Sequence, residues 1–120
     1  MTGARVSALG FGCGSVFLRG YPAVDNGVEC LEKAFEAGVN YFDTAQVYGS
    51  GESERRLGLF LKGRRDEVFV ATKIGVCDGS QFMSRFEQSL NRLQTDRVDL
   101  LHIHGLATHE EVAQIGVKDF

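Results

Sequence analysis

The chain has 120 residues, of which 43% are hydrophobic and 24% charged, values typical of one globular domain. Its formal net charge of -3 provides no basic surface, which argues against nucleic acid or an anionic membrane as a partner. No run of about 18 apolar residues and no signal-peptide pattern is present, so we expect a soluble, cytoplasmic protein. Cys13, Cys30 and Cys77 are too few and too widely spaced for a disulfide framework or a zinc site.

Strand-like and helical segments alternate along the chain, the pattern of a parallel sheet built from βα units. In chain order we predict a strand at 6–11, a helix at 24–37, a strand at 39–43, a helix at 52–63, a strand at 68–73, a helix from an N-cap at Ser80 to Leu93, and a strand at 98–104. Gly38 stands where the first helix needs a C-terminal cap. Residues 110–120 resemble the opening of a further unit.

These units repeat about every 30 residues, whereas a complete (β/α)8 barrel (TIM barrel) needs about 250 residues. We therefore expect a single partial α/β domain over residues 1–120, the N-terminal half of such a barrel, with four parallel strands ordered as in the chain and helices outside. The first and fourth strands would then leave open hydrogen-bonding edges.

Three predicted strands end on a polar residue suited to proton transfer, namely Asp43, Lys73 and His104, and Tyr48 follows the first of these by five residues. The C-terminal ends of barrel strands form the rim where such barrels carry out chemistry, so the four side chains should converge there. Side-chain alternation places the three strand residues on the inner face. Asp43 and Lys73 are expected at the same height on neighbouring strands, close enough for an ion pair.

This arrangement predicts a role for each residue in proton transfer. The Lys73 ammonium would stabilise a tyrosinate, so Tyr48 could donate a proton to a carbonyl oxygen and take it back in the reverse reaction. A neutral His104 could hydrogen-bond the same oxygen and orient the substrate.

The histidines also allow a metal site. His102 and His104, two residues apart on one strand, could hold one ion, as in a metal-dependent hydrolase. His102 also fits an inner barrel layer beneath His104. His109 lies in a polar segment that we predict to be a solvated loop. Cys13 has no cationic neighbour in sequence, so we expect an unreactive thiol.

The stretches around these residues resemble the aldo-keto reductase family. They are residues 7–12, 37–49, 51–54, 71–73, 89–93 and 96–104, in the family's order. The resemblance implies a (β/α)8 barrel that reduces a small aldehyde or ketone with NADPH. It would make Tyr48 the acid, Lys73 and Asp43 its tuning pair, and His104 the orienting group. Gly12, Cys13 and Asp43 match positions that touch the nicotinamide end of the cofactor.

The resemblance also implies what lies outside this segment. The family holds most of its cofactor with later strands, so residues 1–120 are expected to stop before the C-terminal half and to bind NADPH poorly, if at all, on their own. The choice between NADPH and NADH stays open, and the short segment between Lys73 and Ser80 implies a reduced substrate loop. An alternative is a catalytically incomplete half-barrel that acts as a structural or self-associating module through its open sheet edges.

Overall fold

The computed structural model describes residues 3–14 and 24–114. Its elements in chain order are β1 (Gly10–Gly12), α2 (Val24–Glu36), β2 (Tyr41–Asp43), the 3₁₀ turn η1 (Tyr48–Gly51), α3 (Glu52–Phe60), the 3₁₀ turn η2 (Arg65–Glu67), β3 (Phe69–Gly75), α4 (Gly79–Leu93), β4 (Leu100–His104) and α5 (His109–Gln114). The strands form one parallel sheet in the order β1-β2-β3-β4, which confirms the predicted order. Among the described helices, none has the length and apolar character needed to cross a membrane.

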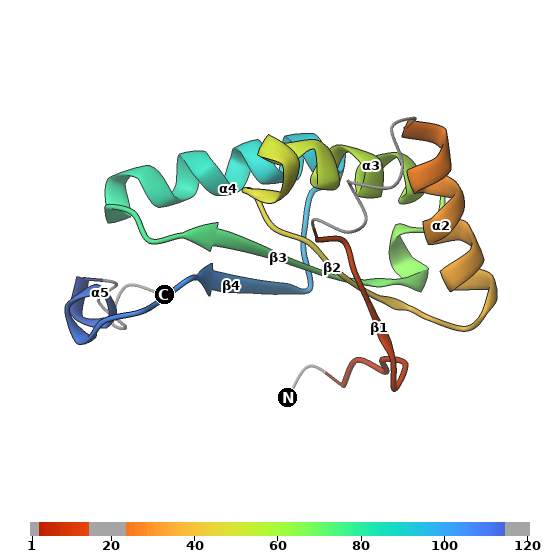
Figure 1. Cartoon of the computed structure of the whole chain (residues 1–120), viewed down its shortest axis with the longest axis horizontal. Helices are drawn as coiled ribbons and strands as arrows, with labels where there is room; N and C mark the ends of the chain where they lie inside the picture. The colour runs from red at the N-terminus through yellow and green to blue at the C-terminus, as the bar shows by residue number, and fades with distance from the viewer. Residues whose placement is uncertain (1–2, 15–23, 115–120) are drawn as a thin grey trace.

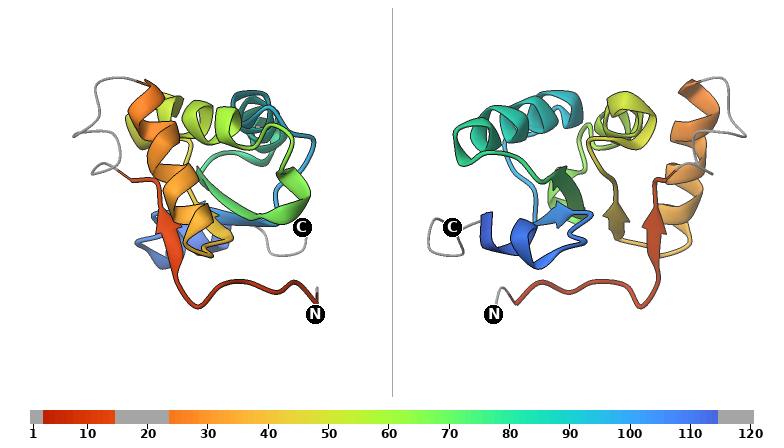
Figure 2. Two further views of the ribbon diagram at one scale, coloured as in Figure 1. Left: turned by 90° about the vertical axis from the view of Figure 1, so that its right-hand side faces the viewer. Right: turned by 60° about the vertical axis from the view of Figure 1, so that its left-hand side comes forward.

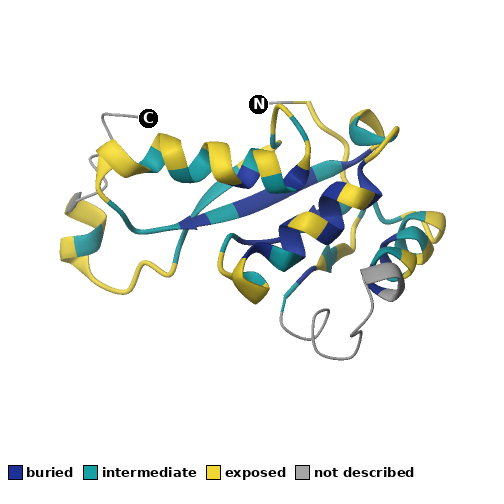
Figure 3. Cartoon of the chain, turned by 90° about the horizontal axis from the view of Figure 1, so that it is seen from above, coloured by how far each residue is buried: buried dark blue, intermediate teal, exposed yellow. Residues whose placement is uncertain are grey.

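Helices α2, α3 and α4 cover one side of the sheet and leave the other side open (Figures 1 and 2). Because side chains alternate along a strand, Phe42 of β2 and Val70 of β3 point toward these helices, and both are fully buried. They join a single apolar core whose other buried members are Cys13, Leu31, Leu57, Phe60, Leu61, Val68 and Leu93. Figure 3 shows the buried residues gathered along β3 and α3, whereas α4 and α5 are largely exposed.

The first strand is shorter than predicted, since β1 begins at Gly10 and not at residue 6. Residues 5–7 are bonded to the Asn40 side chain instead of to a strand. Asn40 Oδ1 accepts from Ser7 N (2.6 Å), and Asn40 Nδ2 donates to Arg5 O (3.0 Å). The Asn40 N–H in turn donates to Ser7 Oγ (3.0 Å). The N-terminal segment is thereby attached to the chain just before β2.

Local hydrogen bonds account for the other boundaries. Gly38, with φ of 90°, caps α2 as predicted: its N–H donates to Phe35 O (2.9 Å) and that of Val39 to Ala34 O (3.0 Å). β2 consequently begins at Tyr41 rather than at residue 39. The predicted segments also differ at other ends: α3 stops at Phe60, β3 runs from Phe69 on to Gly75, and β4 begins at Leu100.

The predicted N-cap of α4 is wrong by two residues. Asp78, not Ser80, caps this helix, because its carboxylate accepts a hydrogen bond from Ser80 N (2.9 Å). This bond lowers the pKa of Asp78 below its ordinary value of 3.8. His109 is exposed as predicted, but it is the first residue of α5 and not part of a loop. The last part of the predicted further unit, residues 115–120, lies outside the described residues.

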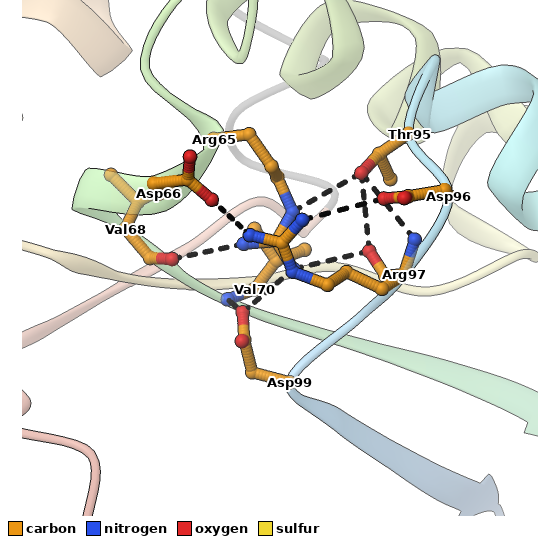
Figure 4. Close-up of polar contacts among 8 residues, drawn as sticks. All are labelled: Arg65, Asp66, Val68, Val70, Thr95, Asp96, Arg97 and Asp99. Atoms are coloured by element: carbon orange, nitrogen blue, oxygen red, sulfur yellow. Dashed lines mark hydrogen bonds and ion pairs between the residues drawn. The ribbon is translucent and has the colours of Figure 1, made fainter.

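A polar cluster joins the N-terminal ends of β3 and β4 (Figure 4). We call it the Arg65 cluster; it comprises Arg65, Asp66, Val68, Val70, Thr95, Asp96, Arg97 and Asp99. The Arg65 guanidinium donates to Thr95 Oγ1 (3.2 Å), Val68 O (3.1 Å) and Arg97 O (3.1 Å). It also pairs with Asp99 Oδ2 (2.8 Å), which accepts from Val70 N (2.7 Å). These contacts connect the segments that enter the two strands.

Candidate active site

Four polar side chains meet at the C-terminal ends of β2, β3 and β4. Lys73 Nζ forms an ion pair with Asp43 Oδ1 and donates to Thr44 O (2.9 Å). The same ammonium lies 5.1 Å from the centroid of the Tyr48 ring. The His104 ring contacts Tyr48 edge-on, with centroids 5.8 Å apart and an interplanar angle of 88°. We call Asp43, Tyr48, Lys73 and His104 the rim cluster.

The rim residues lie at different heights along the strands of the sheet. Asp43 lies opposite Ala71, two residues before Lys73, and His104 lies opposite Gly75, two residues after Lys73. The prediction that Asp43 and Lys73 are at the same height is therefore wrong. Strands in a closed sheet are staggered relative to one another, and a lysine side chain is long enough to span the step.

Tyr48 is placed by the turn η1, which follows the end of β2. Its N–H donates to Ala45 O (3.1 Å), so the loop folds back on itself before the turn. The next three residues, Gly49, Ser50 and Gly51, all have left-handed backbones, with φ of 57°, 55° and 90°. Such a run is favourable for glycine and costs about 1 kcal/mol for a residue such as Ser50. The two glycines thus allow Tyr48 to be presented immediately before α3.

Gly12 and Cys13 differ in their access to the site. Gly12 pairs with Asp43 in the β1–β2 register, and a Cβ built on it would meet nothing within 4 Å. Cys13 has no exposed surface, its N–H donates to Asp43 O (2.8 Å), and its carbonyl accepts from Ser53 Oγ (2.7 Å). Cys13 therefore has no exposed atom with which to make its predicted contact with the cofactor. Burial, with the negative Asp43 nearby, raises the pKa of the Cys13 thiol, as expected for an unreactive cysteine.

In the part of the chain that the structure describes, His102 and His104 have no third side chain that would complete a metal site. No group of three or more His, Cys, Asp or Glu side chains there could hold an ion. His102 lies opposite Lys73 on the inner face of β4, one layer below His104.

Sequence reasoning missed the buried polar residues behind the rim cluster. They are Thr44, Ser53, Glu54, Thr72 and Ser89, and the half-buried Arg92 is bonded to two of them. One signal for them existed, since Glu54 stands at helical spacing before Leu57 and so shares its core-facing side of α3. A carboxylate in such a stripe requires a buried partner.

The model of the Aldo/keto reductase family matches residues 8–114. This chain belongs to the aldo/keto reductase family. It is 43% identical to the L-galactose dehydrogenase of Arabidopsis thaliana, a match that covers 88% of this chain and 36% of that protein. It is 39% identical to the chloroplastic pyridoxal reductase of the same plant, over 82% of this chain and 32% of that protein.

Solved structures of this family share the fold. An aldo-keto reductase from Bacillus halodurans, in its holo form, superposes with a TM-score of 0.82 at 32% identity, over 92% of this chain and 40% of that one. An aldo-keto reductase from Klebsiella pneumoniae in complex with NADPH gives a TM-score of 0.79 at 28% identity, over the same shares. The chain thus spans about two fifths of these enzymes and matches the N-terminal part of their (β/α)8 barrel. The chain therefore belongs to a family of oxidoreductases and contains four strands of the family's barrel.

Proposed function

We propose that this chain supplies the proton-transfer residues of an NADPH-dependent reductase that converts a small aldehyde or ketone to an alcohol. The observation that supports the proposal is the position of Lys73 Nζ, paired with Asp43 and 5.1 Å from the Tyr48 ring, which also contacts His104. A phenol, an ammonium, a carboxylate and an imidazole therefore share one site, which is a complete set for protonating a carbonyl oxygen.

Each rim residue has a distinct task in this reaction. Tyr48 donates its phenolic proton to the carbonyl oxygen as the carbonyl carbon is reduced, and the Lys73 ammonium stabilises the tyrosinate that remains. Asp43 holds the ammonium in place, and His104 hydrogen-bonds the carbonyl oxygen and orients it. In the reverse direction the tyrosinate takes the proton back. General acid assistance of this kind is worth about 10²- to 10⁴-fold in rate.

The residues present fit the nicotinamide end of the cofactor. When bound, NADPH supplies the hydride that reduces the carbonyl carbon. Gly12 and Asp43 lie side by side on the open face of the sheet, and the space above Gly12 is free to receive a flat ring. A Klebsiella pneumoniae relative, 28% identical, is described in complex with NADP and acetate, which supports a nicotinamide nucleotide as the cofactor.

The test is NADPH oxidation with 4-nitrobenzaldehyde, followed by absorbance, in the gene product that carries this chain. Tyr48→Phe should lower kcat by about 10²- to 10⁴-fold, because it removes only the proton donor. Tyr41→Phe is the matched control, since Tyr41 lies on the same inner face at the other end of β2, where its ring contacts Phe69. Undiminished turnover by Tyr48→Phe would contradict the assignment.

A structural role through self-association is the second candidate, and the open sheet edges favour it. In the described residues, β1 and β4 each pair on one side only, and Leu100 and Leu106 near β4 expose 37% and 42% of their surface. Two copies that pair through these edges would sediment as a dimer. A compact monomer that unfolds cooperatively would rule out obligate pairing.

A further inference from the structure

The first turn of α3 carries two consecutive buried polar residues, Ser53 and Glu54, neither of which takes part in the proposed chemistry. Ser53 Oγ donates to Cys13 O (2.7 Å) and lies 2.7 Å from Thr44 Oγ1. A serine hydroxyl has one hydrogen, so Thr44 must be the donor in the second bond. Ser53, Glu54 and Thr44 all have 0% exposure, so these bonds are made entirely away from water.

Glu54 makes the corresponding contact with the next strand. Its Oε1 accepts from Thr72 Oγ1 (2.7 Å) and its Oε2 from Arg92 Nε (2.6 Å). The Arg92 guanidinium also donates to Ser89 Oγ (3.1 Å). The side chain of Arg92 packs so closely on η1 that a Cβ at Gly51 would lie 2.6 Å from Arg92 Cδ. One carboxylate thus connects α3, α4 and β3 directly beneath the turn that bears Tyr48.

The two threonines are the immediate neighbours of two rim residues. Thr44 follows Asp43, and Thr72 precedes Lys73. Adjacent side chains point to opposite faces of a strand, so a bond to Thr72 on the helix side fixes the backbone from which Lys73 reaches into the site. η1 ends at Gly51, directly before the turn that contains Ser53 and Glu54. The first turn of α3 therefore bonds the neighbours of Asp43 and Lys73 and directly follows the turn that carries Tyr48.

We propose that Ser53 and Glu54 are positioning residues that set the geometry of Asp43, Lys73 and Tyr48 through Thr44 and Thr72. Simple packing is a poor explanation of these residues, because apolar side chains of similar volume stabilise a core as well as or better than a buried ion pair does. Directional hydrogen bonds instead hold neighbouring groups at a defined distance. The proposal rests on the proposed reductase function for its kinetic consequence, although its geometric consequence can be measured separately.

The experiment compares three threonine-to-valine variants, which replace a hydroxyl with a methyl group of similar size. Thr44→Val and Thr72→Val remove the two bonds to α3. Thr95→Val is the matched control, because Thr95 Oγ1 accepts from Arg65 Nε (3.2 Å) at the opposite end of the sheet. The first readout is the set of NMR nuclear Overhauser effects between the side chains of Tyr48 and His104 and between those of Tyr48 and Lys73, recorded on the full chain. The second is kcat and KM for aldehyde reduction in the gene product that carries it.

Thr44→Val and Thr72→Val should weaken the rim Overhauser effects at least about twofold and lower kcat by about 10- to 100-fold with little change in KM, since small displacements of catalytic groups have effects of this size. Thr72→Ser should restore both readouts. Thr95→Val should reduce the melting temperature and leave both readouts unchanged. Unchanged Overhauser effects and kcat in Thr44→Val and Thr72→Val, with a loss of stability alone, would overturn the proposal.

The two proposals fail in different ways. Wild-type protein with intact rim Overhauser effects and no turnover would contradict the reductase function and leave the positioning proposal standing. If Thr72→Val does not fold, Ser53→Ala carries the test with the same expected loss, because it removes the acceptor of Thr44 with a change of one oxygen atom. Wild-type rim side chains that show no contacts with one another would overturn the positioning proposal directly.

Discussion

Acidic and cationic side chains gather at both ends of the strands, and the two clusters differ in how fully their polar atoms are bonded. In the Arg65 cluster, Arg65 contacts one hydroxyl, two backbone carbonyls and the Asp99 carboxylate, which also accepts from a backbone N–H. In the rim cluster, Lys73 bonds Asp43 and one carbonyl. Tyr48 and His104 contact each other through their rings, and neither the Tyr48 hydroxyl nor a His104 ring nitrogen forms a hydrogen bond with another described residue.

The difference separates a structural cluster from a reactive one. A charged group whose hydrogen bonds all go to backbone and neighbouring side chains is held in one arrangement and stabilises the chain segments around it. A half-buried phenol and imidazole beside an ammonium, with their side-chain polar atoms not hydrogen-bonded to other described residues, can still bind and exchange protons with another molecule. The same residue types therefore serve folding at one end of the sheet and, in our proposal, catalysis at the other.

Replacing the cation of the rim cluster should have the largest effect, and on activity. Lys73→Met removes the ammonium that stabilises the tyrosinate, so aldehyde reduction should fall by at least about 10²-fold. The unfolding free energy should change less than in Arg65→Met, because Lys73 bonds one carboxylate and one carbonyl, whereas Arg65 bonds one carboxylate, two carbonyls and one hydroxyl. NADPH oxidation and urea unfolding measure the two quantities. Retained turnover would show that the Lys73 ammonium is not needed for catalysis and that the rim cluster is structural, like the Arg65 cluster.

Replacing the cation of the Arg65 cluster should have the opposite effect. Arg65→Met leaves the Asp99 carboxylate and two backbone carbonyls without their donor, and should lower the unfolding free energy by about 2 kcal/mol, less than for a fully buried pair. The rim Overhauser effects should persist. Arg55→Met is the control, since Arg55 is exposed and, among the described residues, pairs only with Glu52, and it should change stability by less than about 0.5 kcal/mol. Equal losses in both variants would remove the distinction.

Helices α3 and α4 pack closely against each other behind the rim cluster, and a substitution at their contact tests how tight this packing is. A Cβ at Gly58 would lie 2.6 Å from Arg92 O and 2.8 Å from Leu93 O, both backbone atoms that cannot rotate away. Gly58→Ala should therefore destabilise the chain by about 1–3 kcal/mol in thermal or urea unfolding. Gly79→Ala is the contrasting variant, because nothing lies within 4 Å there, and it should be neutral or slightly stabilising.

The smallest effect concerns Asp78, an acidic residue after β3 that serves folding alone. Its bond from Ser80 N lowers the pKa of the folded state, so the unfolded chain binds the proton more readily. The contribution to stability is thus present above the ordinary pKa of 3.8 and is lost as pH falls through the lower folded value. Asp78→Ala should lower stability at neutral pH, and its difference from wild type should shrink as pH falls below 3.8.

Asp78→Asn provides the control for that titration. An asparagine keeps the cap and cannot titrate, so the stability difference between this variant and Asp78→Ala should be independent of pH. A difference between Asp78→Ala and wild type that is independent of pH would show that the carboxylate charge plays no part.

The sequence predicted what depends on local periodicity and strand polarity. Asp43, Lys73 and His104 could be placed on one face at one end of the sheet because parallel strands all end at the same rim and their side chains alternate. The two-residue steps between them could not be predicted, since the stagger is a property of the whole sheet. The N-cap at Asp78 was missed because Asp and Ser are equally good caps and stand two residues apart.

The polar contacts of the interior could not be predicted from the local sequence, for a different reason. Glu54 bonds Thr72 and Arg92, which are 18 and 38 residues further along the chain. Such partners become neighbours only after the helices pack on the sheet, and no periodicity in the sequence pairs them. Arg65 and Asp99 are separated by a similar length of chain, so the Arg65 cluster was missed for the same reason.

The most direct test of the contrast between the two ends is a titration of the isotopically labelled chain with NADPH, followed by amide chemical shifts. Weak binding is sufficient for this measurement. The account predicts that the largest shifts fall on Gly12, Thr44 and the residues around Lys73 and His104, while the amides of Val70 and Asp99 stay unchanged. Shifts concentrated at the Arg65 cluster, with the rim amides unchanged, would contradict it.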